Sequence, residues 1–121
     1  MKANELRIGN WVMYNGNPEQ IDGIQPSWLW VRLDSMSMSH FAPIELTPEI
    51  LVKAGFETCT QNNDGSYNFW GKNIDTSIDV DTDNLYRYRI NERHRTKAIQ
   101  YLHQLQNLYY ALTGFELEIK M

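Results

Sequence analysis

The sequence predicts an α+β fold in which short antiparallel strands precede one long helix. The first observation is a series of short apolar runs, separated by tight turns, in residues 6–46. The second is a pair of hairpin patterns in residues 56–90, and the third is an amphipathic helical pattern in residues 97–113. A helix with a broad apolar stripe must bury that stripe, so we expect the long helix to pack on the sheet.

Length and charge limit what the chain is built to do. The 121 residues suffice for a single domain, made of a β-rich part, residues 1–46, and a second part, residues 47–121, with a short helix, a meander of strands and the long helix. The net charge of −4 argues against a nucleic-acid partner and against a membrane surface. The chain opens without a signal-peptide pattern and lacks a run of about 20 apolar residues, so we expect a cytoplasmic protein.

Three strands are predicted in the β-rich part, at residues 11–14, 20–25 and 28–33. Each is short and is bounded by Gly, Asn or Pro residues that favour turns. Short strands with tight turns predict a small SH3-like barrel or a curled antiparallel sheet. Residues 34–41, with alternating Ser and Met, are expected to form a loop.

The strand at residues 28–33 has two different faces. Its aliphatic side chains, at positions 29, 31 and 33, alternate with a second set on the opposite face: Trp28, Trp30 and Arg32. Indole rings beside a guanidinium are typical of a surface on which bases stack. The alternative is that the long helix or a partner chain covers this face. The sequence leaves both readings open.

The second part begins with a short helix and continues with two hairpins. Thr47 is expected to cap this helix, Pro48 to occupy its first position and Gly55 to end it. An Asp-Gly turn at 64–65 predicts a hairpin that pairs Thr60 with Phe69.

The second hairpin is predicted around a three-residue loop, Asp83-Asn84-Leu85. This loop pairs Val80 with Tyr88 on one face and sets Asp79 opposite Arg89 on the other. A two-residue loop would place the arginines among the aliphatic side chains, because a one-residue slip swaps the two faces.

The long helix has an apolar arc and a polar arc. Thr96 is a suitable N-cap, and Gly114 is a natural stop. His103 and Asn107 lie one turn apart on the polar arc, near two glutamines. These groups either contact a ligand, remain solvated, or hold a neighbouring loop in place.

A basic segment precedes the helix, and cations at a helix N-terminus are unfavourable because that end carries partial positive charge. The segment contains Arg93, His94, Arg95 and Lys97. An anion bound at the free N–H groups would compensate for them, which predicts a site for an anionic, nucleotide-like molecule. The alternative is a solvated loop whose cations are screened by nearby acidic residues.

Patterns for metal binding and catalysis are incomplete. Asp79, Asp81 and Asp83 imitate the start of an EF-hand loop, but the position of its final Glu is occupied by Ile90. The single cysteine, Cys59, has no histidine at a spacing that predicts a nucleophile and base. We therefore expect no metal site, no cofactor and no catalytic residues.

Three stretches resemble one family of small uncharacterised proteins encoded by Bacteroidetes genomes and their phages or prophages. They are Leu6-Arg7-Ile8-Gly9-Asn10-Trp11-Val12, residues 43–51 continuing to Gly55-Phe56, and the segment YLHQLQNLYYALTG at residues 101–114. The resemblance implies a bacterial host cell and a phage context, and it carries no known activity.

These patterns predict a non-enzymatic accessory protein that binds another protein and that also forms a homo-oligomer. The abundance of aromatic residues, 12% of the chain, supports this interpretation. One alternative is the binding of an anionic small molecule, used to sequester a host signal. A second is weak nucleic-acid binding through Trp28, Trp30 and Arg32.

Overall fold

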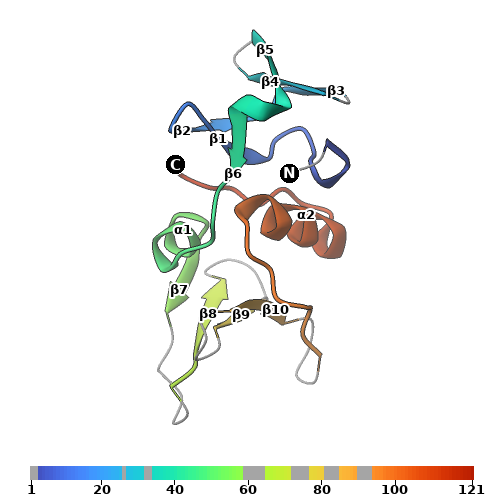
Figure 1. Ribbon diagram of the computed structural model, residues 1–121. Helices are drawn as coiled ribbons and strands as arrows, with labels where there is room; N and C mark the ends of the chain where they lie inside the picture. Colours follow the sequence, from blue (N-terminus) through green and yellow to red (C-terminus); the bar gives the residue numbers. More distant parts are fainter. Residues whose placement is uncertain are drawn as a thin grey trace. The chain divides into compact units, whose positions relative to one another are not determined.

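The computed structural model confirms an α+β fold (Figure 1). It describes residues 3–25, 27–31, 34–58, 65–71, 77–80, 85–89 and 94–121. The chain divides into two compact units. The N-terminal unit consists of Met1–Glu45 and Tyr101–Glu116, and the C-terminal unit consists of Leu46–Gln100 and Leu117–Met121.

The described residues of the N-terminal unit form two three-stranded antiparallel sheets, two short 3₁₀ helices and the long helix. The first sheet has the order β2-β1-β6 and the second the order β3-β4-β5. The strands are β1 (Trp11–Tyr14), β2 (Asn17–Gln20), β3 (Gly23–Gln25), β4 (Trp28–Val31), β5 (Asp34–Ser37) and β6 (Phe41–Pro43). The helices are η1 (Ala3–Glu5), η2 (Met38–His40) and α2 (Leu102–Thr113).

Two expectations for this unit are corrected. The described strands form two separate sheets rather than a barrel, because the chain leaves the first sheet after β2 and returns to it only through η2. The segment expected to be a loop at residues 34–41 instead contains β5 and η2. Its Ser-Met alternation is a strand pattern, because Met36 lies opposite the buried Leu29 and packs against the apolar core.

The core of the N-terminal unit draws on both of its sheets. Six buried apolar residues form one cluster: Leu6, Val12, Ile21, Leu29, Val31 and Phe41. Residues 29 and 31 come from the face of β4 that the sequence predicted to be internal. The alternation along this strand therefore identified the buried face correctly.

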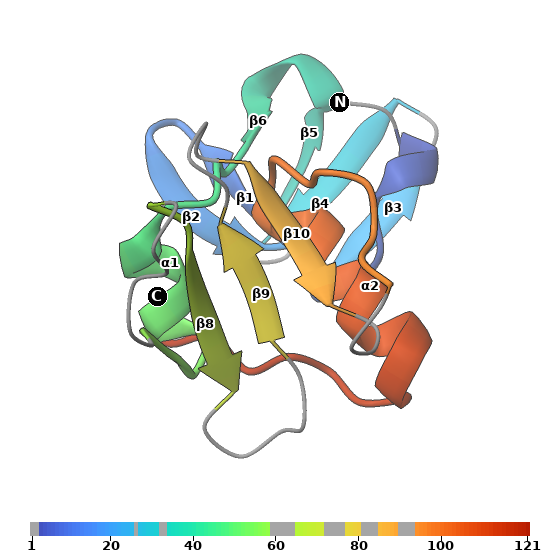
Figure 2. The ribbon, with the colours of Figure 1, turned by 90° about the horizontal axis from the view of Figure 1, so that it is seen from below.

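The described part of the C-terminal unit forms a short helix and a four-stranded antiparallel meander with the order β10-β9-β8-β7. Its elements are α1 (Pro48–Lys53), β7 (Phe56–Thr58), β8 (Tyr67–Gly71), β9 (Ser77–Val80) and β10 (Tyr86–Arg89). Figure 2 shows β8, β9 and β10 side by side. The predicted helix signals are confirmed, because the Thr47 hydroxyl accepts a hydrogen bond from the Ile50 N–H at 3.2 Å and Gly55 has a φ of 91°.

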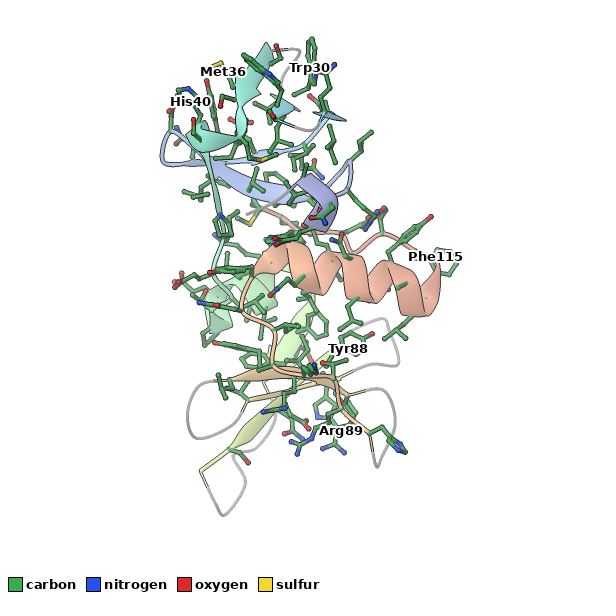
Figure 3. The ribbon with its side chains drawn as sticks, turned by 45° about the vertical axis from the view of Figure 1, so that its right-hand side comes forward. Trp30, Met36, His40, Tyr88, Arg89 and Phe115 are labelled. Carbon is green, nitrogen blue, oxygen red and sulfur yellow. The ribbon has the colours of Figure 1, made fainter. Side chains whose placement is uncertain are left out.

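Both hairpins have a register two residues away from the predicted one. Phe69 pairs with Thr58 rather than with residue 60, and Val80 pairs with Tyr86 rather than with Tyr88. A shift of two residues changes the partners of the described strand residues but not the face on which they lie. Figure 3 shows this alternation on β10, where Tyr88 and Arg89 point to opposite sides of the strand.

The long helix begins later than predicted and belongs to the N-terminal unit. It starts at Leu102, not near residue 97, and it ends as expected at Gly114, which has a φ of 78°. Thr96 is not its N-cap: its hydroxyl accepts from the Tyr88 N–H at 3.1 Å and its own N–H donates to the Tyr88 carbonyl at 2.9 Å. The segment before the helix is extended because it forms hydrogen bonds with the backbone groups at the edge of β10.

Candidate functional site

Two exposed tryptophans of the N-terminal unit lie on one face of β4. Trp28 and Trp30 are 46% and 36% exposed, whereas Leu29 between them is fully buried. Residues directly opposite one another in antiparallel strands share a face. By the observed pairing, the tryptophan face therefore comprises Gly23, Gln25, Trp28, Trp30, Ser35 and Ser37.

The Trp30 ring is held in place by a glycine on the neighbouring strand. A Cβ atom at Gly23 would lie 3.2 Å from Cδ1 of Trp30, so the indole packs closely over the glycine backbone. In Figure 3, Trp30 projects from β4 at the outside of the unit. The two rings thus stand on a strand whose other side is anchored in the core, which fixes the platform before any partner binds.

The third predicted member of this surface, Arg32, lies outside the described residues. None of the six residues of the tryptophan face carries a charge. The surface that the structure describes is therefore aromatic and uncharged, with hydroxyl and amide groups beside the rings.

The polar arc of α2 holds the beginning of the chain in place. The side-chain oxygen Oδ1 of Asn107 accepts from Arg7 Nε at 3.0 Å and from Asn10 Nδ2 at 2.8 Å. Its Nδ2 donates to the Glu5 backbone carbonyl at 2.8 Å. The sequence left three readings for this arc, and the structure selects attachment of a neighbouring segment for Asn107.

Gln106, which the sequence did not single out, makes the most buried of these attachments. Its side chain is 1% exposed, accepts from the Trp11 N–H at 2.8 Å and donates to the Gly9 carbonyl at 3.1 Å. Both partners are backbone groups that need a bond when water is excluded. No sequence signal marks such a glutamine, because a polar residue on a helix is by default assigned to solvent.

His103, on the same arc, is 1% exposed. Its ring stacks on Tyr101, with centroids 5.8 Å apart and planes 9° from parallel. Its Nε2 lies 3.7 Å from Oε2 of Glu5, which is too long for a hydrogen bond. Burial lowers the pKa of His103 below its ordinary value of 6.5, and the Glu5 carboxylate opposes this shift only in part.

The basic segment does not stand at a helix N-terminus. His94, Arg95 and Lys97 are exposed, Arg93 lies outside the described residues, and α2 begins only at residue 102. The premise that these cations lie at a helix N-terminus is therefore wrong, and the anion site itself stays a prediction. The cause is the extended pairing of residues 95–99 with β10.

Arg95 instead joins an ion cluster around Asp79. Arg89 forms a bidentate pair with this carboxylate, with Nε to Oδ1 at 3.3 Å and Nη2 to Oδ2 at 2.8 Å. Arg95 Nη1 lies 3.4 Å from the same Oδ2. Asp79 is buried, at 4% exposure, and two guanidinium groups compensate its charge.

The described residues lack a metal-binding group and a helix that could span a membrane. They contain no group of three or more His, Cys, Asp or Glu side chains placed to hold a metal ion. No helix in this part of the chain is both long and apolar enough to cross a membrane. Cys59, Asp81 and Asp83 lie outside it.

No protein-family model, no curated protein and no solved structure matches this chain.

Proposed function

We propose that this protein is a non-enzymatic binding module that contacts a partner protein through the tryptophan face. The observation that carries the proposal is the pair of exposed indole rings of Trp28 and Trp30 on one face of β4. The family resemblance of residues 101–114 is consistent with an accessory protein of phage or prophage origin in a bacterial cell.

Tryptophan is the residue type most enriched in the parts of protein interfaces that dominate affinity. Each ring presents a large apolar area with few rotatable bonds, so little entropy is lost when a partner covers it. Two such rings on a strand anchored by Leu29 form a rigid platform. Exposed apolar area of this kind is characteristic of an interaction site.

Charge separates a protein partner from a nucleic acid. Nucleic-acid affinity comes largely from Lys and Arg contacts with phosphates. The described tryptophan face carries no cation, and the whole chain has a net charge of −4. The proposal therefore favours protein, and the simplest partner to test is a second copy of the chain.

The test compares exposed tryptophans of the two units. The double variant Trp28→Ala/Trp30→Ala is set against Trp70→Ala, which removes a ring that is also 46% exposed but lies on β8 of the C-terminal unit. Native mass spectrometry and sedimentation velocity measure self-association. Quantitative affinity capture from the host measures other partners.

We expect the double variant to lose association by at least about tenfold, since truncating one central tryptophan costs about 2 kcal/mol or more. Trp70→Ala should associate like the wild type. The single variant Trp28→Ala keeps the Trp30 ring packed over Gly23. It therefore shows whether a loss of association reflects binding or a folding defect. Equal association of the double variant and the wild type would contradict the proposal.

The alternatives predict different results. Binding to oligonucleotides that falls steeply as salt rises would support a nucleic-acid partner. An anionic small molecule retained in native mass spectrometry and lost on denaturation would support the ligand-binding alternative. The displacement of the basic segment from the helix start removes the geometric reason for that alternative.

A further inference from the structure

His103 differs from the other buried polar side chains of the N-terminal unit. Asn10 and Gln106 are equally buried and are satisfied by hydrogen bonds. Among the described residues, neither Nδ1 nor Nε2 of His103 has a hydrogen-bond partner. A buried polar group without a partner in a native fold calls for an explanation.

The ring lies where the first 3₁₀ helix is attached to α2. Glu5, the last residue of η1, approaches the ring with its side chain at 3.7 Å and binds Asn107 with its backbone carbonyl at 2.8 Å. Tyr101 covers the ring from the segment just before α2. A change in the charge of the ring therefore alters the interactions that attach η1 to α2.

The charged groups around His103 act in opposite directions. Glu5 favours the imidazolium, whereas the positive charge of the chain's amino terminus disfavours it. Burial, which penalises the charged ring, is the largest influence. A form of the protein in which the ring reaches water therefore binds a proton more readily than the closed form, and acid shifts the population towards that open form.

We propose that His103 is a proton-operated latch whose protonation releases η1 from α2. This device is additional to the proposed binding function and does not depend on the tryptophan face. The release is local, because Arg7 forms a second attachment through its 2.6 Å ion pair with Glu116 and through its contact with the Tyr110 ring.

The test is amide hydrogen exchange of η1 and the residue after it, followed by NMR at about pH 7.5 and about pH 5, on either side of the ordinary histidine pKa. The Leu6 N–H, which donates to the Ala3 carbonyl at 3.1 Å, reports the state of η1. After division by the intrinsic exchange rate at each pH, the opening constant of the wild type should rise on acidification.

Three variants separate the contribution of the His103 ring from other effects of pH. His103→Gln should show no rise in the opening constant, and His40→Gln, which alters an exposed histidine of the same unit, should behave like the wild type. Glu5→Gln should increase the response to acid, because it removes the carboxylate that favours the charged ring. A purely structural role for His103 would change the opening constant equally at both pH values.

A measurement on the wild type keeps the proposal testable if His103→Gln fails to fold. The imidazole proton shifts give the titration midpoint of His103 in the closed form. The opening constant of the Leu6 amide should rise as pH falls below the ordinary histidine pKa and level off near that midpoint. An opening that instead follows carboxylate titration, near pH 4, would overturn the proposal. So would an acid response in His103→Gln equal to that of the wild type, or no response in the wild type.

Discussion

The two units bury their polar side chains in different chemical forms. In the N-terminal unit the buried polar groups are neutral amides, Asn10 and Gln106, bonded mainly to backbone atoms, together with the imidazole of His103. In the C-terminal unit the principal buried group is the carboxylate of Asp79, held by two arginines. Amide networks depend on geometry, whereas an ion cluster depends on charge, so the two units should respond to different perturbations.

The largest effect is expected when the charge in the C-terminal unit is removed. Asp79→Ala removes the buried carboxylate that Arg89 and Arg95 share. We expect a loss of about 3 kcal/mol in the free energy of unfolding, at the low end for a broken buried pair because both arginines reach water. Urea unfolding measures it.

The neutral variant Asp79→Asn keeps an acceptor at the same position and serves as the control. Its loss should be smaller than that of Asp79→Ala. If the two variants were equally destabilised, charge rather than hydrogen bonding would account for the whole effect. A loss below about 1 kcal/mol in both, typical of exposed ion pairs, would contradict the description of a buried ion cluster.

A smaller effect is expected in the amide network of the N-terminal unit. Gln106→Leu leaves the Trp11 N–H without its partner, and we expect a loss of about 2 kcal/mol in unfolding free energy. Gln20→Leu is a matched control, because Gln20 Nε2 donates to the same Gly9 carbonyl at 3.1 Å but is exposed. Its loss should stay within about 0.5 kcal/mol.

Comparison of Gln106→Leu with Gln20→Leu separates the effect of burial from that of the hydrogen bond. Both side chains donate to the Gly9 carbonyl, but only Gln106 is buried. Chemical denaturation of both variants under one set of conditions gives the two losses directly. Equal losses would mean that the attachment of α2 to the Trp11 backbone contributes no more than a surface hydrogen bond.

The smallest effect concerns pH. Because burial lowers the pKa of His103 in the folded state, its contribution to stability is complete above the ordinary pKa of 6.5 and is lost as pH falls towards the lowered value. Thermal unfolding of the wild type should therefore show a midpoint that falls with acidification in this window. In His103→Gln the fall should be reduced, and a slope identical to the wild type would contradict the assignment.

Several local features followed from sequence patterns alone. Thr47, Pro48 and Gly55 marked both ends of α1, and Gly114 marked the end of α2. Alternation also identified which side of β4 is buried. These features are local because a cap, a left-handed glycine or a two-residue period depends on residues within a few positions of each other.

The strand registers and the contacts of polar residues could be determined only from the tertiary structure. Alternation specifies the face of a strand but not a shift of two residues, so Phe69 and Val80 kept their faces and changed their partners. Thr96 is a good N-cap in isolation, yet pairing with β10 placed it in an extended segment, and the helix began at residue 102. The competing contact is distant in sequence, and no local signal records it.

The features of the candidate site also divide into those that the sequence predicts and those that depend on the tertiary structure. The sequence by itself placed Trp28 and Trp30 on one face of a strand, because their spacing and the aliphatic residues between them determine this. Only the tertiary structure decided that this face is exposed while His103 and Gln106, on the polar arc of a helix, are buried. Exposure depends on which surfaces of distant segments meet, and a polar side chain becomes internal wherever the fold supplies partners that replace water.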